Sequence, residues 1–179
     1  MRTLVLGGIR SGKSQWAEAA VAEAAGDGPV RYLATGTLTE QDPAWSARVS
    51  AHRARRPAHW HTVECRTAEG GLPAQLGGIS TATLVDDIGG WLTSTMDDRG
   101  AWAGSSVATD VDELVRAVDA CTAPLVLVSP EVGLTVVPAT AAGRRFADEL
   151  GSVNQRLAAA CDRVVLVVAG QPITVKESS

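Results

Sequence analysis

The sequence predicts an α/β fold in which a doubly wound, mainly parallel sheet is flanked by helices. Two observations carry this prediction. Short apolar runs alternate with longer stretches of helical character along the 179 residues, the pattern of parallel strands joined by crossover helices. The runs are almost continuously Val and Leu, which is typical of strands buried on both faces. We expect one domain spanning residues 1–179, because this length suits a single core.

Five apolar runs are predicted as buried strands. In chain order they are Thr3–Leu6, Arg31–Ala34, Thr81–Asp86, Leu125–Ser129 and Arg163–Ala169. The run His59–Glu64 is a further candidate strand.

Helices are predicted between the strands, at Lys13–Ala25, Ala44–Arg55, Ile88–Met96, Val111–Cys121 and Arg144–Ala160. One face of the last helix carries apolar residues at helical spacing, namely Phe146, Leu150, Val153 and Leu157. Asp110 is expected to cap the helix that begins at Val111. The stretch Asp97–Ser106 is rich in Gly, Asp and Ser and is expected to form a surface loop.

The composition argues against several classes of function. The net charge of −4 disfavours a general nucleic-acid binder. No apolar run approaches the ~20 residues of a membrane span, and the first residues lack the apolar core of a signal peptide, so a cytoplasmic location is expected. Three widely spaced cysteines fit neither a disulfide framework nor a zinc site, and small buried hydrophobes are expected at Cys65, Cys121 and Cys161.

A complete G-x-x-x-x-G-K-[ST] motif follows the first predicted strand. It comprises Gly7, Gly8, Ile9, Arg10, Ser11, Gly12, Lys13 and Ser14. Glycines let backbone N–H groups turn around phosphate oxygens, and the helix that begins here directs its positive end toward the same anion. Lys13 is expected to reach the β- and γ-phosphates as a catalytic cation, and Ser14 to ligate Mg²⁺. The motif predicts a P-loop NTPase fold.

A P-loop also needs a carboxylate at the end of a neighbouring strand to hold the metal. Asp86 ends the run Ala82–Asp86 and is the expected second ligand of Mg²⁺, beside Ser14. Two alternatives stay open. In the first, Asp86 only caps the next helix. In the second, Glu131, which follows the run Leu125–Ser129, binds the metal in place of Asp86.

Four arginines surround one histidine between Arg48 and Pro57 of this acidic chain. Guanidinium groups suit phosphate recognition because they are planar and permanently charged. A neutral imidazole can act as a base or as a nucleophile on phosphorus, which makes His52 a candidate catalytic residue. From the residues alone, a solvated basic helix face is the favoured interpretation of this pattern. His59 and His61 are expected at the surface.

A series of further motifs follows the phosphate loop in a fixed order. Its first part contains Tyr32-Leu-Ala-Thr35, Arg48-Val-x-x-His52, Arg56-Pro57, Trp60-x-Thr62-Val-Glu64 and Leu84-Val-Asp86…Trp91-Leu-Thr. Its second part contains Glu131-Val-Gly133, Val137-Pro138, Arg145-Phe-x-Asp148, Gly151, Asn154-Gln155 and Val-Ala-Gly170…Lys176. From Leu4 to Lys176 the chain thereby resembles the bifunctional adenosylcobinamide kinase/adenosylcobinamide-phosphate guanylyltransferase family of adenosylcobalamin biosynthesis.

The resemblance implies two reactions and a homotrimer; that no nucleic acid is among the partners is expected from the net charge instead. The family phosphorylates the aminopropanol hydroxyl of adenosylcobinamide with ATP or GTP. It then transfers GMP from GTP to that phosphate, by way of a guanylylated histidine that matches His52, and releases pyrophosphate. Nucleotide contacts are implied at residues 7–14 and at Ala34, Thr35, Gly36, Arg53, Ala54, Arg55, Arg56, Glu64 and Asp86.

A few positions depart from the family's pattern. Pro130 stands where Asn is common, Asp87 stands where Cys or a small residue is common, and Gly89-Gly90 begins the helix after Asp86. These departures concern the corrinoid contacts and the efficiency of each step. Two other functions stay open: a P-loop kinase of another small metabolite, or a nucleotide-binding switch protein.

Overall fold

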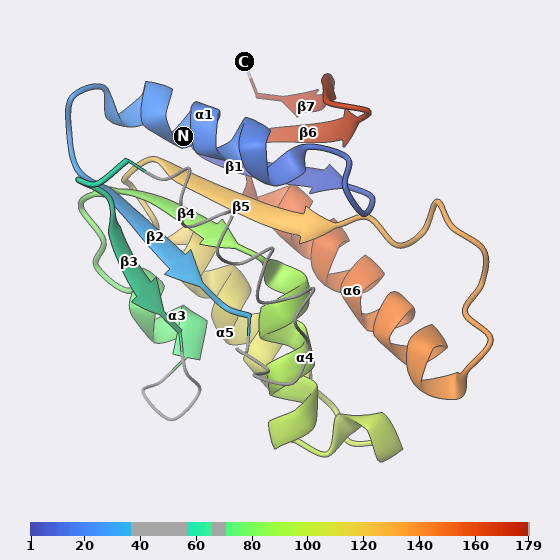
Figure 1. The fold of residues 1–179 in the computed structure, drawn as a ribbon. Coiled ribbons are helices and arrows are strands. Elements are labelled where there is room, and N and C mark those ends of the chain that lie inside the picture. The colour runs from blue at the N-terminus through green and yellow to red at the C-terminus, as the bar shows by residue number, and fades with distance from the viewer. Residues whose placement is uncertain (37–56, 66–70, 179) are drawn as a thin grey trace.

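The structure, a computed structural model, describes residues 1–36, 57–65 and 71–178. The predicted helix Ala44–Arg55 and the candidate His52 lie outside the described residues. Within them, seven strands form one sheet with the order β3-β2-β4-β5-β1-β6-β7 (Figure 1). Strands far apart in the sequence therefore pair, and β1 lies between β5 and β6.

Six strands run parallel and one antiparallel. The parallel strands are β1 (Arg2–Gly7), β2 (Val30–Ala34), β3 (His61–Glu64), β4 (Ala82–Asp86), β5 (Leu125–Pro130) and β6 (Arg163–Val168). The antiparallel strand is β7 (Gln171–Glu177), which pairs with β6 along one edge. Because parallel strands end at a common edge, the loops that follow β1, β2, β4 and β5 gather on one side of the molecule.

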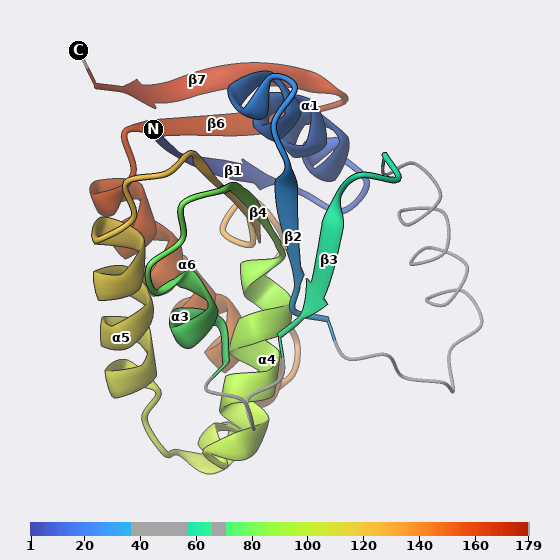
Figure 2. The same cartoon turned by 90° about the vertical axis from the view of Figure 1, so that its left-hand side faces the viewer.

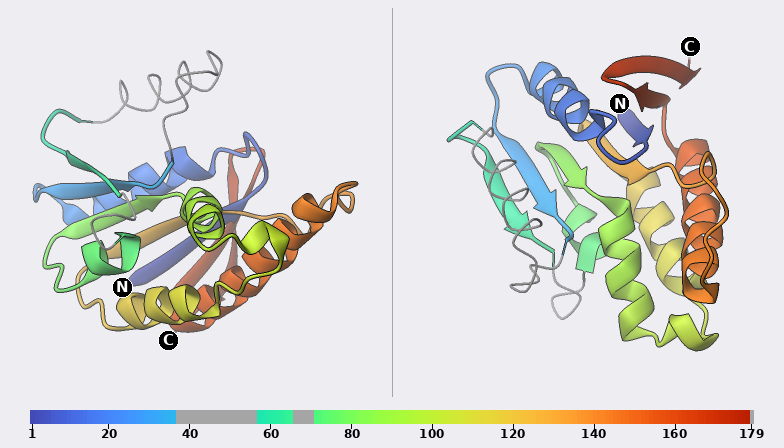
Figure 3. Two further views of the ribbon diagram at one scale, coloured as in Figure 1. Left: turned by 90° about the horizontal axis from the view of Figure 1, so that it is seen from below. Right: turned by 45° about the vertical axis from the view of Figure 1, so that its right-hand side comes forward.

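Helices cover both faces of the sheet (Figures 1 and 2). One face is covered by α1 (Lys13–Ala25), and the other by α3 (Gly71–Leu76), α4 (Ile88–Asp98), α5 (Ala108–Asp119) and α6 (Ala141–Ala160). On the second face, α5 and α6 lie side by side (Figure 3). Strand residues alternate between two buried layers, so Leu84 packs toward α1 and Val85 toward the other helices. The predicted doubly wound α/β class is confirmed.

Most predicted helices and strands, including α1, are confirmed within a few residues. The predicted apolar face of α6 is also confirmed, because Leu150, Val153 and Leu157 are buried and Phe146 is partly buried. The prediction for Asp110 is wrong. The helix begins earlier, with Val107 at the N-cap position, and Asp110 instead binds Arg99 at 2.7 Å.

Three segments differ from the sequence-based expectation. The stretch 97–106 is not simply a surface loop, because it holds the 3-10 turn η2 (Ala101–Ala103), in which Ala101 is buried. The short helix α3 and the edge strand β7 were not predicted. In β7 all residues but Lys176 are exposed, so the strand lacks the continuous apolar run that marks the others.

The cysteines are free; Cys161 is buried and the other two partly buried. Burial raises the pKa of the Cys161 thiol to about 12. None of the helices in the described ranges is long and apolar enough to cross a bilayer.

Charged side chains hold together the ends of elements opposite the phosphate loop. The guanidinium of Arg2, at the start of β1, binds Asp162 before β6 at 2.9 Å and Asp119 at the end of α5 at 2.8 Å. The backbone N–H of Arg2 also donates to Asp162, at 2.7 Å. At the other end of the chain, the Lys176 ammonium donates to the carbonyls of Ala158, Ala159 and Cys161 at the end of α6, where a cation offsets the helix dipole.

The Arg2–Asp162 pair predicts a pH-dependent contribution to stability. Hydrogen bonds from Arg2 hold the pKa of the Asp162 carboxyl below its usual value. The stabilisation that this pair contributes is therefore full above about pH 4, and it is lost as the pH falls through the pKa of Asp162 in the folded protein. We expect Asp162→Asn to lower the free energy of unfolding by about 1 kcal/mol at pH 7, since the pair is partly exposed, and by much less at pH 3, as measured by urea denaturation. Asp119→Asn is the matched control on the same arginine; its more exposed carboxylate predicts a smaller effect. An equal loss from Asp162→Asn at both pH values would contradict the assignment.

Candidate nucleotide-binding site

The glycine-rich motif forms the turn between the end of β1 at Gly7 and the start of α1 at Lys13. Gly12 occupies the N-cap position with φ of 94°, a conformation that glycine adopts without strain. A Cβ on Gly12 would also lie 3.2 Å from Cα of Gly170. The motif glycine therefore serves both the turn and the close approach of the β6–β7 connection.

Backbone hydrogen bonds fix the loop at two points. The N–H of Glu131 donates to the carbonyl of Gly7 at 3.0 Å, and the N–H of Gly170 donates to the carbonyl of Ser11 at 2.8 Å. Within the loop, the N–H of Ser11 donates to the carbonyl of Gly8 at 3.3 Å. The strands on either side of β1 thus hold the backbone that would surround a phosphate.

Two side chains of the loop carry the chemistry that the motif predicts. Lys13 is partly exposed, and its ammonium donates to the carbonyl of Gly8 at 3.2 Å, so it lies over the loop itself. The Ser14 hydroxyl lies 3.4 Å from Oδ1 of Asp86. In the same loop, the hydroxyl oxygen of Ser11 is buried and has no hydrogen-bond partner among the described residues.

Asp86 reaches Ser14 from a strand that is not adjacent to β1. The sheet order places β5 between β1 and β4, so the expectation of a carboxylate on a neighbouring strand is corrected to one strand further away. The Ser14 hydroxyl and the Asp86 carboxylate are both hard oxygen donors, which is the ligand chemistry that Mg²⁺ prefers. Glu131, the alternative carboxylate, instead accepts a hydrogen bond from the N–H of Gly133 at 2.6 Å.

The end of β2 holds Asp86 and Asp87 in place, a role that the sequence analysis missed. The Tyr32 hydroxyl donates to Oδ2 of Asp86 at 2.6 Å, which leaves Oδ1 facing Ser14. The N–H of Thr35 donates to the carbonyl of Asp86 at 3.3 Å, and its hydroxyl donates to the carbonyl of Asp87 at 2.5 Å. A signal was present, because the chain's single tyrosine stands in a buried strand, where its hydroxyl needs a partner.

The helix after β4 is capped by Asp87 and not by Asp86. The Asp87 carboxylate accepts from the N–H of Gly90 at 2.7 Å. Burial, and secondly the charge of Asp86, raise the pKa of Asp87 to about 6. With Asp87 as the N-cap, the carboxylate of Asp86 is available to face the loop.

The two glycines at the start of α4 allow close approaches that larger residues would block. A Cβ on Gly89 would lie 3.0 Å from Cγ of Pro130, and one on Gly90 would lie 3.2 Å from Oγ1 of Thr35. Two departures from the family's pattern, Pro130 and Gly89, are therefore in contact with each other. Gly90 lets the end of β2 pack against the helix beside the aspartates.

Some of the other residues predicted to contact the nucleotide lie at the same edge of the sheet as Asp86. Ala34 lies in register with Asp86 on one side and with Glu64 on the other. Ala34, Thr35 and Gly36 therefore end or follow β2, the strand next to Asp86, and Glu64 ends β3 one strand further away. His59 and His61 are exposed, as expected. His52 and the residues Arg53, Ala54, Arg55 and Arg56 lie outside the described residues.

The contact between Tyr32 and Asp86 predicts an energetic coupling. Tyr32→Phe removes the hydrogen bond to Oδ2, and we expect it to lower the free energy of unfolding by about 1 kcal/mol. In an Asp86→Ala background the same change should cost much less, because the partner is already gone. Urea denaturation of the four proteins measures the coupling; additive effects would mean that the hydroxyl does not hold this carboxylate.

Comparison with known proteins places the chain in a family. The sequence model of the family described as cobinamide kinase / cobinamide phosphate guanyltransferase matches residues 3–175. The bifunctional adenosylcobalamin biosynthesis protein CobU of Salmonella typhimurium is 39% identical, with 98% of this chain and 100% of that protein covered. The corresponding CobP of Pseudomonas aeruginosa is 38% identical, with 98% of each chain covered. CobU of Escherichia coli is 34% identical, with 98% and 100% covered.

Among solved structures, the P4 protein from bacteriophage φ6 in complex with ADP aligns with 95% of this chain and 51% of its own, at 17% identity and a TM-score of 0.43. That likeness is too distant to carry an argument. The family match and the relatives that cover nearly the whole chain do carry one, and with the phosphate loop they show that this chain belongs to the cobinamide kinase / cobinamide phosphate guanyltransferase family.

Proposed function

We propose that this protein phosphorylates adenosylcobinamide with ATP or GTP and then transfers GMP from GTP to the new phosphate, by way of a guanylylated His52. The observation that carries the proposal is the phosphate loop of a family member, with Ser14 facing Asp86 at 3.4 Å. The relatives are themselves named bifunctional. Homotrimer formation and a cytoplasmic location stay predictions that follow from the sequence.

In the kinase step the protein supplies position and charge. The backbone of the loop Gly7–Ser14 is held from both sides before a ligand arrives, which suits a preorganised phosphate site. Lys13 would move from the carbonyl of Gly8 to the β- and γ-phosphates of the nucleotide. The substrate hydroxyl then attacks the γ-phosphorus, and the nucleoside diphosphate leaves.

In the second step an imidazole nitrogen of His52 attacks the α-phosphorus of GTP. A P–N bond forms, the bond to the leaving oxygen breaks, and pyrophosphate is released. A phosphate oxygen of adenosylcobinamide phosphate next attacks the same phosphorus, the P–N bond breaks, and the imidazole is restored. The covalent intermediate divides one difficult displacement into two. Arg53, Arg55 and Arg56 lie next to His52 in the chain and supply positive charge for the phosphates.

Ser14 and Asp86 are the residues that would hold Mg²⁺. When bound, the ion would offset negative charge on the triphosphate and on the leaving pyrophosphate. Ala34, Thr35 and Gly36 end or follow β2, which pairs with the strand of Asp86, and Glu64 ends β3 on the far side of β2. We assign these residues to the nucleoside end of the ligand. The nucleotide then extends from the phosphate loop across the carboxyl edge of the sheet.

The guanylyl-histidine makes a direct prediction. Incubation of the protein with Mg²⁺ and GTP labelled at the α-phosphate, without corrinoid, should leave an acid-labile, base-stable label on the denatured protein. We expect His52→Ala to abolish the label. His59→Ala is the matched control, since His59 is exposed and follows the predicted helix, and it should label normally. An unlabelled wild-type protein would remove the transferase step and leave a P-loop kinase.

The phosphate loop makes a separate prediction for the first step. Lys13→Ala should lower the rate of adenosylcobinamide phosphorylation at least ~100-fold, because charge on the transferred phosphoryl group is no longer offset. The phosphorylated corrinoid is quantified by chromatography, and thermal unfolding checks that the variant is folded. Normal turnover by a folded Lys13→Ala protein would count against the loop as the kinase site.

A further inference from the structure

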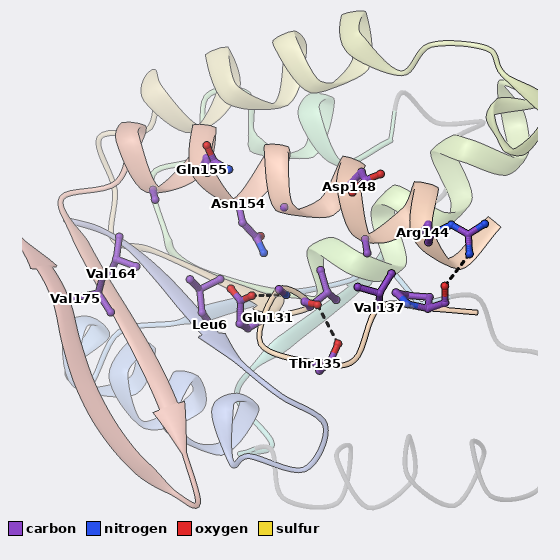
Figure 4. Close-up of a pocket in the computed structure, with 16 residues that line it drawn as sticks. Leu6, Glu131, Thr135, Val137, Arg144, Asp148, Asn154, Gln155, Val164 and Val175 are labelled. Atoms are coloured by element: carbon purple, nitrogen blue, oxygen red, sulfur yellow. Dashed lines mark hydrogen bonds between the residues drawn. The ribbon is translucent and has the colours of Figure 1, made fainter. Parts of the chain in front are cut away.

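A cavity of about 480 Å³ lies outside the nucleotide site, between α6, the loop that follows β5, and the sheet (Figure 4). Its apolar wall comes from the sheet, through Leu6, Val164 and Val175. Its opposite wall is the face of α6 that carries Asp148, Gly151 and Gln155. We refer to this space as the α6 cavity.

The α6 cavity begins next to the phosphate loop. Leu6 immediately precedes Gly7, the first residue of the loop, and Glu131 binds the carbonyl of Gly7 through its N–H at 3.0 Å. Both Leu6 and Glu131 line the cavity. A molecule that occupies this space therefore has one end beside the place where the γ-phosphate of a nucleotide is expected.

The lining combines apolar surface with polar groups that have no structural task. The side chains of Asp148 and Gln155 make no hydrogen bond or ion pair with any other residue that the structure describes. Asn154, in contrast, is already used, since it donates to the carbonyl of Pro130 at 3.0 Å and accepts from the Ser129 hydroxyl at 2.6 Å. Apolar walls with a few convergent polar groups are typical of a small-molecule site.

Glu131 is held in a defined position within this lining. Its carboxylate accepts from the N–H of Gly133 at 2.6 Å, and a Cβ on Gly133 would lie 2.9 Å from that same oxygen. A side chain at position 133 would therefore press on this carboxylate and shift it. Glu131 places a carboxylate at the end of the cavity that adjoins the phosphate loop.

The motifs of the second half of the chain gather at this cavity, although the nucleotide site uses none of their side chains. They follow β5 and run along α6, and the members that line the cavity include Glu131, Gly133, Asp148, Gly151, Asn154 and Gln155. With Leu6, Val164 and Val175 on the apolar wall, segments that are far apart in sequence contribute to one space. Figure 4 shows the labelled side chains of this group on the helix and the loop around it.

We propose that the α6 cavity is the acceptor site, and that it binds the alcohol-bearing arm of the corrinoid together with the adjoining edge of the ring. This inference rests on the proposed function. The volume suits part of the substrate and not the whole macrocycle, so the remainder projects into solvent. Apolar walls contact the ring edge, Asp148 and Gln155 bind its amide side chains, and the hydroxyl lies at the Glu131 end, toward the phosphate loop.

Gly151 offers a sharp test, because its side of α6 faces open space. No heavy atom lies within 4 Å of a Cβ built on Gly151, and its backbone is helical. Gly151→Leu should therefore fold normally, since leucine favours a helix more than glycine does, while its side chain fills part of the cavity. The matched control is Ser152→Leu, which adds the same side chain at the neighbouring exposed position outside the cavity.

Equilibrium dialysis with adenosylcobinamide measures the result. We expect Gly151→Leu to raise the Kd for the corrinoid at least ~10-fold and Ser152→Leu to leave it unchanged. Both variants should keep the wild-type affinity for GTP and the wild-type protein label from α-labelled GTP. Gln155→Ala, which removes an exposed amide without filling space, should raise the same Kd several-fold and tests the site independently of how Gly151→Leu folds.

Wild-type corrinoid affinity in folded Gly151→Leu and in Gln155→Ala would overturn the assignment. If light scattering also shows a changed molar mass in Gly151→Leu at unchanged corrinoid affinity, the cavity is a contact between copies of this chain and the proposal is wrong. Failure of the proposed function looks different. In that case the wild-type protein itself neither binds nor phosphorylates adenosylcobinamide, and the acceptor site is lost with it.

Discussion

Two backbone hydrogen bonds from distant parts of the chain shape the phosphate loop, and the nucleotide site depends on them. The N–H of Glu131 holds the carbonyl of Gly7, and the N–H of Gly170 holds the carbonyl of Ser11. A loop that binds an anion through its own N–H groups must have the right shape before the anion arrives. The sheet provides this shape because β5 and β6 flank β1, so that one strand end approaches each side of the loop.

The same edge of the sheet organises the carboxylates. Tyr32 in β2 and Thr35 just after it hold Asp86 and Asp87 through three hydrogen bonds. These contacts divide the two neighbouring acids between two tasks, one facing Ser14 and one capping α4. The alcohol acceptor would approach from the other side, past Glu131. In the proposed arrangement, nucleotide and acceptor would reach the loop from different sides.

The sequence predicted most of the elements that carry a strong local pattern. The phosphate loop, its strand and its helix follow from the order of glycines, lysine and serine after an apolar run, and the buried face of α6 follows from its spacing. The edge strand β7 escaped prediction because its side chains are mostly exposed, so no burial pattern marks it. The link between Tyr32 and Asp86 joins residues 54 positions apart, and the two walls of the α6 cavity belong to different segments. Such relations depend on the sheet order, which local periodicity does not encode.

The order of strands has a consequence for how the protein is made. On the ribosome, β1 and the glycine-rich turn leave the exit tunnel before the other strands of this sheet, yet both strands that pair with β1 come from the second half of the chain, after residue 124. A nascent chain that ends before Gly170 lacks one of the two N–H groups that anchor the turn. Pairing over such separations is slow compared with local helix formation. The nucleotide pocket, encoded first, is therefore among the last parts of the molecule to be completed during synthesis.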